Sequence, residues 1–310
     1  MAVPEQDLVA RQSFVQATEV WIPDAAGARL AFGGGVYGGH KGFGGVSAGR
    51  GFARGEGLPG RAWAEGRPVF VADMAGAGLP RSEAAGRAGL TAAAAVPVFA
   101  GAALTGVLVL LCGEDEDRSG AVEIWRGAGD VMSLDGGFYG AARAFAEVSR
   151  ATTFERGQGL PGGVWAAEAA MLMRDLGRAS GFVRARAAQA AGLVAGLGVP
   201  VPTPGGEPFV LTLLSARATP IARRFELWEV AGGRGGRPPV ATLTDGLCEV
   251  EGPLWGKERQ LQAWQGAVGR AMASGAPVAE ASPAGAPYAG QVALPIHRHA
   301  EVTQVVAWFI

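Results

Sequence analysis

Three tryptophan-containing segments recur along the chain at a spacing of about one hundred residues. EVWIPD begins at Glu19, EIWRGA at Glu123 and ELWEVA at Glu226, so their tryptophans are separated by 104 and 103 residues. Self-similarity at a fixed period is the signature of a repeated structural unit. The sequence therefore predicts three copies of one small fold.

Two further segments follow the same period. GEGLPGRAWAEGRPVFVAD, which contains Trp63, returns as GQGLPGGVWAAEAAMLMRD, which contains Trp165. Each unit closes on a pair of apolar segments, which read AAVPVFAGAALTGVLVLL, LGVPVPTPGGEPFVLTLL and VALPIHRHAEVTQVVAWF in chain order. The register of the repeat thus rests on several independent segments.

The order of local patterns predicts the fold of one unit. A strand with the Glu-x-Trp signature comes first, and a glycine-rich strand follows it. The Leu-Pro-Gly sequence begins a short helix, because proline suits the first helical turn. RPVFVAD is β-branched and aromatic, which is typical of a strand, and the unit ends in two apolar strands joined by a turn. We expect an α+β fold in which each unit is an antiparallel sheet flanked by short helices.

Composition excludes several classes of function. Lys+Arg 27 against Asp+Glu 28 gives a net charge of -1, without the basic stripe that nucleic acid selects. Cys112 and Cys248 form no CxxC pair, so neither a disulfide framework nor a zinc site is indicated. The longest apolar run is interrupted by Pro97, Gly101 and Gly106, which favours paired strands over membrane insertion. No secretory signal pattern opens the sequence, so we expect a cytoplasmic protein.

The first unit resembles a GAF domain. The resemblance rests on GEGLPGRAWAEGRPVFVAD followed by GRAGLTAAAAVPVFAGAALTGVLVLL, and it covers most of residues 19–112. The second unit keeps the Leu-Pro-Gly segment and the closing strands, and the third has Met272 where the first two have tryptophan. The resemblance implies three degenerate GAF-like domains, at residues 19–114, 120–217 and 223–310. An amphipathic pattern before them predicts an N-terminal helix at residues 1–18.

The resemblance implies small-molecule binding between the sheet and the helices that cover it. The family's cyclic-nucleotide signature includes asparagine, which this chain lacks, so that ligand class is excluded. Bilin attachment needs a cysteine in or beside the covering helix, and neither Cys112 nor Cys248 is expected there. The methionine sulfoxide reductase branch needs several clustered cysteines for thiol exchange, which a single cysteine in a unit cannot provide. His297 and His299 are expected to be polar residues beside a hairpin turn rather than metal ligands. We therefore expect no cofactor, no metal and no catalytic residues.

The first unit supplies the candidate ligand-binding residues, which offer an apolar wall with one acid and one base. Trp63 and its counterpart Trp165 have two open interpretations, since a tryptophan on a covering helix closes a ligand pocket or simply fills it. The predicted ligand-binding residues are Phe52, Trp63, Asp73, Met74, Arg87 and Phe99.

Two functions from different classes remain open. The first is a non-catalytic, cytoplasmic sensory or regulatory adaptor that binds a small ligand in the first domain. Such a protein acts through a protein partner or a homo-oligomer, because the sequence has no segment left for an output domain. The alternative is a structural or assembly subunit of a larger complex, whose GAF-like domains are closed and ligand-free. We expect no binding to nucleic acid in either case.

Overall fold

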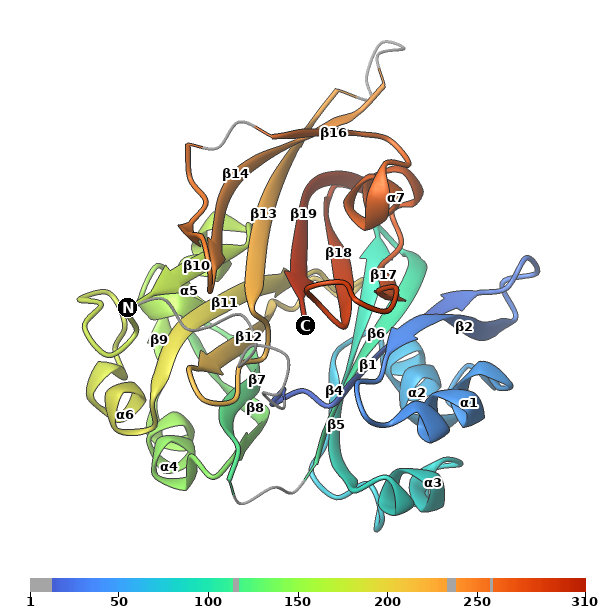
Figure 1. The fold of residues 1–310 in the computed structure, drawn as a ribbon, viewed down its shortest axis with the longest axis horizontal. Helices are drawn as coiled ribbons and strands as arrows, with labels where there is room; N and C mark the ends of the chain where they lie inside the picture. Colours follow the sequence, from blue (N-terminus) through green and yellow to red (C-terminus); the bar gives the residue numbers. More distant parts are fainter. Residues whose placement is uncertain (1–12, 114–116, 233–237, 257–258) are drawn as a thin grey trace.

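Three antiparallel sheets with one strand order make up the structure, which is a computed structural model describing residues 13–113, 117–232, 238–256 and 259–310 (Figure 1). In each sheet the unit's second strand pairs with its first, the first pairs with the last, and the last pairs with the strand before it. This arrangement confirms the α+β fold expected from the sequence.

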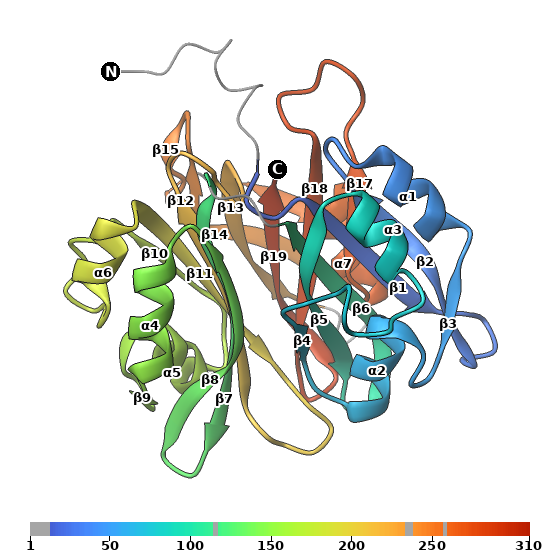
Figure 2. The ribbon, with the colours of Figure 1, turned by 90° about the horizontal axis from the view of Figure 1, so that it is seen from below.

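The first unit forms a six-stranded sheet with three helices on one of its faces (Figure 2). The second strand is rich in glycine, and the last two strands are the long apolar pair of the sequence pattern. Its elements are β1 (Ala17–Pro23), β2 (Arg29–Val36), α1 (Lys41–Ala48), β3 (Gly51–Ala53), α2 (Gly57–Glu65), β4 (Val69–Val71), α3 (Ser82–Arg87), β5 (Leu90–Ala100) and β6 (Ala103–Gly113).

The second unit repeats the first element by element. It also has a six-stranded sheet and three helices. Its elements are β7 (Ser119–Ala128), β8 (Val131–Gly140), α4 (Arg143–Ala151), β9 (Phe154–Glu155), α5 (Gly159–Ala167), β10 (Met171–Arg174), α6 (Ala185–Ala190), β11 (Leu193–Val201) and β12 (Phe209–Ala216).

The third unit keeps the sheet but has a single helix among its described residues. One short strand, Gly252–Pro253, stands where the first two units carry a helix after the second strand, and no helix lies between the last three strands of the third unit. Its elements are β13 (Arg224–Ala231), β14 (Val240–Cys248), β15 (Gly252–Pro253), β16 (Gln260–Gln262), α7 (Gly266–Ser274), β17 (Val278–Ala281), β18 (Gly290–Arg298) and β19 (Glu301–Phe309).

A glycine in the first turn of α2 explains the repeated Leu-Pro-Gly sequence. A β-carbon at Gly60 would lie 2.2 Å from the carbonyl oxygen of Ala53, far inside van der Waals contact. The same clash would arise at Gly162 in α5, at 2.1 Å, and at Gly269 in α7, at 2.3 Å. The third unit has lost Leu-Pro but keeps this glycine, so the close approach of helix and preceding strand is the conserved constraint among the three copies.

The three tryptophans of the repeat occupy equivalent places. Trp21, Trp125 and Trp228 pair with a valine of the last strand of their own sheets and are at most 1% exposed. A register shift precedes each of them on its pairing with the second strand. Because a one-residue slip would reverse every side chain of a strand, this agreement confirms the predicted register of the repeat.

Each sheet buries both of its faces. One face packs under the helices of its own unit and forms a separate apolar core in each unit. The opposite faces meet in a common core, to which Leu108 of β6, Leu211 of β12 and Val306 of β19 contribute from the three units. Figures 1 and 2 show the helices of the first two units at the periphery, with the sheets turned toward one another.

The units contact one another head to tail in a closed ring. The strand after the central helix of each unit lies against the second strand of another unit: β4 on β8, β10 on β14, and β17 on β2. Phe70 of β4 packs so closely on Gly136 of β8 that a β-carbon there would lie 2.8 Å from it. Arg174 of β10 donates to the carbonyl of Gly246, 2.8 Å away, and to the Asp245 carboxylate.

The predicted N-terminal helix is wrong over residues 13–18, and residues 1–12 lie outside the described part of the chain. Residues 13–16 are not helical, and β1 begins at Ala17. The Phe14 N–H donates to the carbonyl of Pro220 at 3.2 Å, and the Gln16 N–H donates to that of Leu111 at 2.9 Å. The apolar side chains of Phe14 and Val15 enter the common core instead of forming one helical stripe.

We predict that Gly34→Ala destabilises the ring where β17 meets β2. Gly34 has a φ of 145°, and a β-carbon there would lie 2.2 Å from the carbonyl oxygen of Ala279. Overpacking and backbone strain together should lower the free energy of unfolding by about 2 kcal/mol or more in urea denaturation. The control is Gly45→Ala in α1, where nothing lies within 4 Å and alanine favours the helix. Equal stability of the two variants would contradict this packing.

Candidate functional site

A buried carboxylate and a buried guanidinium face each other inside the first unit. Arg81 donates from Nη1 to Oε1 of Glu19 at 2.7 Å and from Nη2 to Oε2 at 2.8 Å. Glu19 also accepts from Trp21 Nε1 at 3.0 Å, the Tyr37 hydroxyl at 3.1 Å and the Ser47 hydroxyl at 2.6 Å. Glu19 is 0% and Arg81 5% exposed, so the pair is removed from water.

Four elements of the unit bring these groups together. Glu19 and Trp21 are two residues apart on β1, so their side chains share the sheet face that the helices cover. Tyr37 follows β2 directly, and Ser47 lies in the last turn of α1. Arg81 immediately precedes α3, in the segment that links β4 to β5. The Arg81 side chain, from the segment between β4 and β5, therefore occupies the interior of the unit.

Aromatic rings surround the Arg81 guanidinium. Its Cζ atom lies 5.1 Å from the ring centroid of Trp21, 5.0 Å from that of Phe43 and 5.4 Å from that of Phe52. Rings within about 6 Å attract a cation through their negative faces, and more strongly where water is excluded. We call the Glu19 carboxylate and these rings the guanidinium cage.

The second unit holds an equivalent cage. Arg184 pairs with both oxygens of Glu123, with a distance of 2.9 Å between Nη2 and Oε2. Tyr139 donates to Glu123 at 3.1 Å and Thr212 donates at 2.8 Å. The aromatic rings within 6 Å of the Arg184 guanidinium are those of Trp125, Phe145, Phe154 and Phe182.

Burial and hydrogen bonding fix the protonation of the buried groups. Burial alone would raise the pKa of Glu123, but the Arg184 charge and the hydrogen bonds from Arg184, Thr212 and Ser149 hold that pKa below its ordinary value. Burial, and then the neighbouring carboxylate, raises the pKa of Tyr139, and the same causes raise the pKa of Tyr37 beside Glu19. The Glu123 carboxylate is thus ionised, and the hydroxyls of Tyr37 and Tyr139 remain donors.

The third unit has the carboxylate but not the cage. Glu226 accepts from Trp228 Nε1 at 3.0 Å, as in the other units. Its cationic partner is Arg224, two residues earlier on the same strand, whose Nε donates to Oε1 at 2.6 Å. Arg259 approaches Glu226 at 3.5 Å with a side chain that is 52% exposed. Among its described residues, the third unit has no counterpart of α1, which supplies Ser47, or of α3, which Arg81 immediately precedes.

The six residues predicted to bind a ligand do not form one site. Phe52 and Met74 lie in the interior core of the first unit. Trp63 is half-buried against that core, and with Phe99 it lines a cleft of about 380 Å³ between the first and second units. Asp73 is exposed and accepts from backbone N–H groups of its own turn, while Arg87 is exposed and pairs with Glu83.

The acid and base of the interior are therefore Glu19 and Arg81, which the sequence analysis did not select. The repeat contained the signal. Glu19, Tyr37, Ser47 and Arg81 recur as Glu123, Tyr139, Ser149 and Arg184 at offsets of 102 to 104 residues. Polar residues that recur in register with core positions indicate a buried network, because an unpaired copy would be costly.

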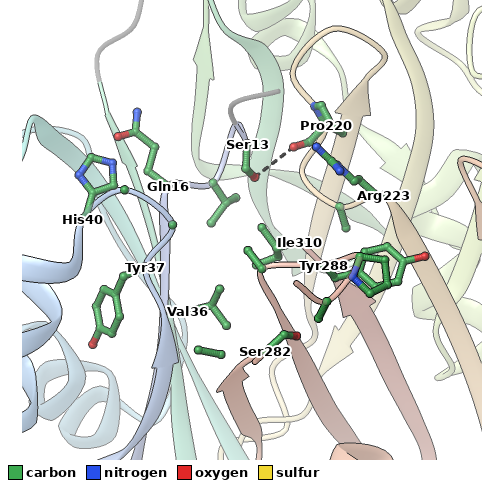
Figure 3. Close-up of a pocket in the computed structure, with 18 of the residues that line it drawn as sticks. Ser13, Gln16, Val36, Tyr37, His40, Pro220, Arg223, Ser282, Tyr288 and Ile310 are labelled. Atoms are coloured by element: carbon green, nitrogen blue, oxygen red, sulfur yellow. Dashed lines mark hydrogen bonds between the residues drawn. The ribbon is translucent and has the colours of Figure 1, made fainter. Parts of the chain in front are cut away.

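A cavity of about 790 Å³ lies between the first and third units, beside the links that connect them to the second (Figure 3). The first unit supplies Val15, Val36 and the segment after β2, the links between units supply Arg118 and residues 220–223, and the third unit supplies residues 281–289. Tyr37 and His40 lie on one side of the cavity, and Arg223 and Tyr288 on the opposite side (Figure 3). The cavity therefore opens between units, not within one.

The lining of this central cavity combines apolar and cationic groups. Val15, Val36 and Ile221 provide apolar surface. The charged side chains among the described lining residues are all basic, namely Lys41, Arg118 and Arg223, and His40 accompanies them. Burial, and then the neighbouring Arg118, lowers the pKa of His40.

Two further classes of site were sought in the described residues. They contain no group of three or more histidine, cysteine, aspartate or glutamate side chains placed to hold a metal ion. Cys112 and Cys248 are free and buried. Among the helices that the structure describes, none is long and apolar enough to cross a membrane.

We predict that Arg184→Met destabilises the protein by about 3–5 kcal/mol, because it leaves the Glu123 charge buried without its partner. The double variant Glu123→Gln/Arg184→Met removes both charges and should be more stable than the single variant in urea denaturation. Arg186→Met, at an exposed position in α6, is the control and should change stability by about 0.5 kcal/mol or less. A double variant less stable than the single one would contradict this account.

We predict that Glu123 contributes to acid unfolding. Its pKa in the folded protein lies below the ordinary value of 4.5, so the unfolded chain takes up the proton first as pH falls. The stabilisation is present above that ordinary value and is lost progressively below it. Urea denaturation between about pH 6 and pH 3 should show a steeper loss of stability for the wild type than for Glu123→Gln. Parallel pH profiles would be evidence against the lowered pKa.

Comparison with known proteins bears on the first unit. A GAF domain family profile matches residues 10–134. No curated protein matches the chain. Two solved structures are similar to parts of it. The A. aeolicus NLH2 GAF domain in an inactive state has 15% identity and a TM-score of 0.26, covering 31% of this chain and 57% of that one. A NreA protein of Staphylococcus aureus, mutated in its nitrate-binding site, has 17% identity and a TM-score of 0.26, covering 34% of this chain and 80% of that one.

The chain thus spans little more than half of the first of these structures. The family match covers the unit that contains the Glu19–Arg81 pair, and the other two units repeat its strand order and its tryptophan register. The chain is a tandem of three units with one strand order, and the GAF domain family profile matches the first of them.

Proposed function

We propose that the protein is a non-catalytic sensory regulator that binds a small anionic molecule in the central cavity. GAF domains are sensory and ligand-binding regulatory domains. The observation that carries the proposal is the cavity of about 790 Å³ between the first and third domains and the two links that join them to the second. That volume falls in the range of about 300–1,000 Å³ that is usual for small-molecule sites.

The interiors of the first two domains favour the central cavity over a site within one domain. Arg81 and Arg184 occupy the space between sheet and helices, and both are at most 5% exposed. A ligand in that position would have to displace a paired buried arginine, which costs several kcal/mol. The central cavity requires no such displacement. The ligand predicted in the first domain alone is therefore reassigned to the junction.

The chemistry of the lining favours an anion with an apolar body. Lys41 and Arg118 provide positive charge that would attract a carboxylate or phosphate. Val36 and Ile221 can cover an apolar part of the same molecule. The cationic side chains alone would not distinguish this molecule from a free inorganic anion, whereas the apolar side chains favour an anion with an apolar part.

The position of the cavity suggests how binding is transmitted. The chain connects the first domain to the second and the second to the third, whereas the third meets the first through β17 and β2 without a covalent link. A ligand between residues 36–41 and residues 281–289 would bridge this junction. We propose that the bridged and unbridged forms differ in affinity for a protein partner in the cytoplasm.

An assembly subunit with closed domains is the second candidate. The buried pairs Glu19–Arg81 and Glu123–Arg184 favour it, because they fill two domain interiors with the chain's own side chains. In this case the central cavity would hold solvent, and the protein would act through its surface alone.

We predict that purified protein retains an anionic compound from a metabolite extract. The retained compound is released by denaturation, identified by mass spectrometry and then titrated calorimetrically. Ser282→Trp, which places a large side chain at the cavity, should weaken its binding at least about tenfold. Ala26→Trp, at the exposed turn between β1 and β2, is the matched control and should bind as the wild type does.

Two results would contradict the proposal. Retention of no anionic compound would favour the assembly role. Equal affinity of Ser282→Trp and Ala26→Trp would place the ligand outside the central cavity.

A further inference from the structure

We propose that the interiors of the first and second domains are guanidinium-binding sites that the chain occupies with its own arginines. The inference concerns the guanidinium cages and does not depend on the central cavity. It assigns these two interiors to planar cations of the guanidinium and amidinium class.

The carboxylate geometry selects a planar, forked cation. Two nitrogens of Arg81 meet the two oxygens of Glu19 at 2.7 and 2.8 Å, one nitrogen to each oxygen. Such parallel hydrogen bonds fit guanidinium and amidinium groups, whereas an ammonium ion acts as a point charge. The site therefore recognises the shape of the cation as well as its charge.

Donors other than the arginine help to position the carboxylate. Ser47 donates to Glu19 but also accepts from Arg81 at 2.6 Å, so its position depends in part on the arginine. Trp21 and Tyr37 also donate to Glu19, and both belong to elements other than the Arg81 segment. These donors would hold the carboxylate in place with the arginine removed. Binding sites that are ordered before the ligand arrives lose less free energy on binding.

The aromatic walls complete the selection. Three rings in the first domain and four in the second lie within 5.5 Å of the guanidinium carbon, and the pairs are removed from water. A neutral molecule of the same shape, such as urea, would gain neither the attraction of the rings nor that of the carboxylate. An anion would be repelled by both.

Arg81 comes from a segment that lies largely at the surface. Gly78 and Pro80 are exposed, and the helix that follows Arg81 extends over only six residues. Withdrawal of this segment would open the cage without separating the strands of the sheet. A small guanidinium compound could then occupy the position of the arginine head group.

The third domain provides an internal contrast. Glu226 is paired with Arg224 of its own strand, and the aromatic ring near Arg224 is that of Phe309, 5.8 Å away. A cage of several rings is not formed around either of the two arginines near Glu226 in the described residues. We therefore assign no guanidinium site to the third domain.

Chemical rescue tests the inference. Arg81→Ala and Arg184→Ala each empty one cage, and melting temperature is measured with guanidinium chloride, urea or potassium chloride at about 20 mM. Guanidinium should raise the melting temperature of both variants by about 2–4 °C, because it binds the folded form. Urea and potassium chloride should not. The wild type, whose cages are filled, should show no rise with guanidinium.

Arg87→Ala is the matched control, since it removes an exposed arginine from the same segment and should respond as the wild type does. If an alanine variant does not stay folded, the readout is the fraction recovered on refolding with guanidinium against the fraction recovered with urea. Equal effects of guanidinium and urea, or equal rises in Arg81→Ala and Arg87→Ala, would overturn the proposal. Neither outcome depends on whether the central cavity binds a metabolite.

Discussion

The packing of three sheet faces into one common core is the constraint on which the rest of the structure depends. A sheet with one face under its helices still has a second apolar face, and here that face is covered by the other two units. Leu108, Leu211 and Val306 show how each closing strand contributes to this core. The apolar character of the closing strands on both faces follows from it, since neither face meets water.

The buried ion pairs are the second constraint, and they change what these domains can do. A charge pair inside a protein loses the free energy of hydration, and this loss is offset only by good geometry and additional hydrogen bonds. Glu19 and Glu123 have both, with a forked arginine and several neutral donors each. Such a pair specifies one arrangement of the covering segment, because a shifted segment would leave two charges unpaired. It also occupies the space that a ligand of a single domain would need.

The sequence predicted the number of units, the class of fold and the tryptophan register, because these follow from spacing and apolar periodicity. It did not predict the buried acid–base pair. Phe52 and Met74 were expected in the interior and lie there, but Asp73 and Arg87, which were selected as the acid and base, are exposed. The actual pair joins positions 62 residues apart, which only the fold brings together. The prediction of a helix over residues 13–18 was wrong for the same reason, since the Phe14 N–H donates to the carbonyl of Pro220.

The head-to-tail ring limits how this architecture can grow. In a solenoid each added repeat stacks on an open end, so families differ freely in repeat number. Here the contact of β17 with β2 returns the series to its starting point, as rotation does in a closed oligomer. A fourth unit could be accommodated only by opening an existing contact and changing the angle at every other one. Copy number is thus determined by geometry, while covalent linkage leaves each copy free to diverge. The third unit has diverged in this way, with a short strand in place of one helix and a loop in place of another.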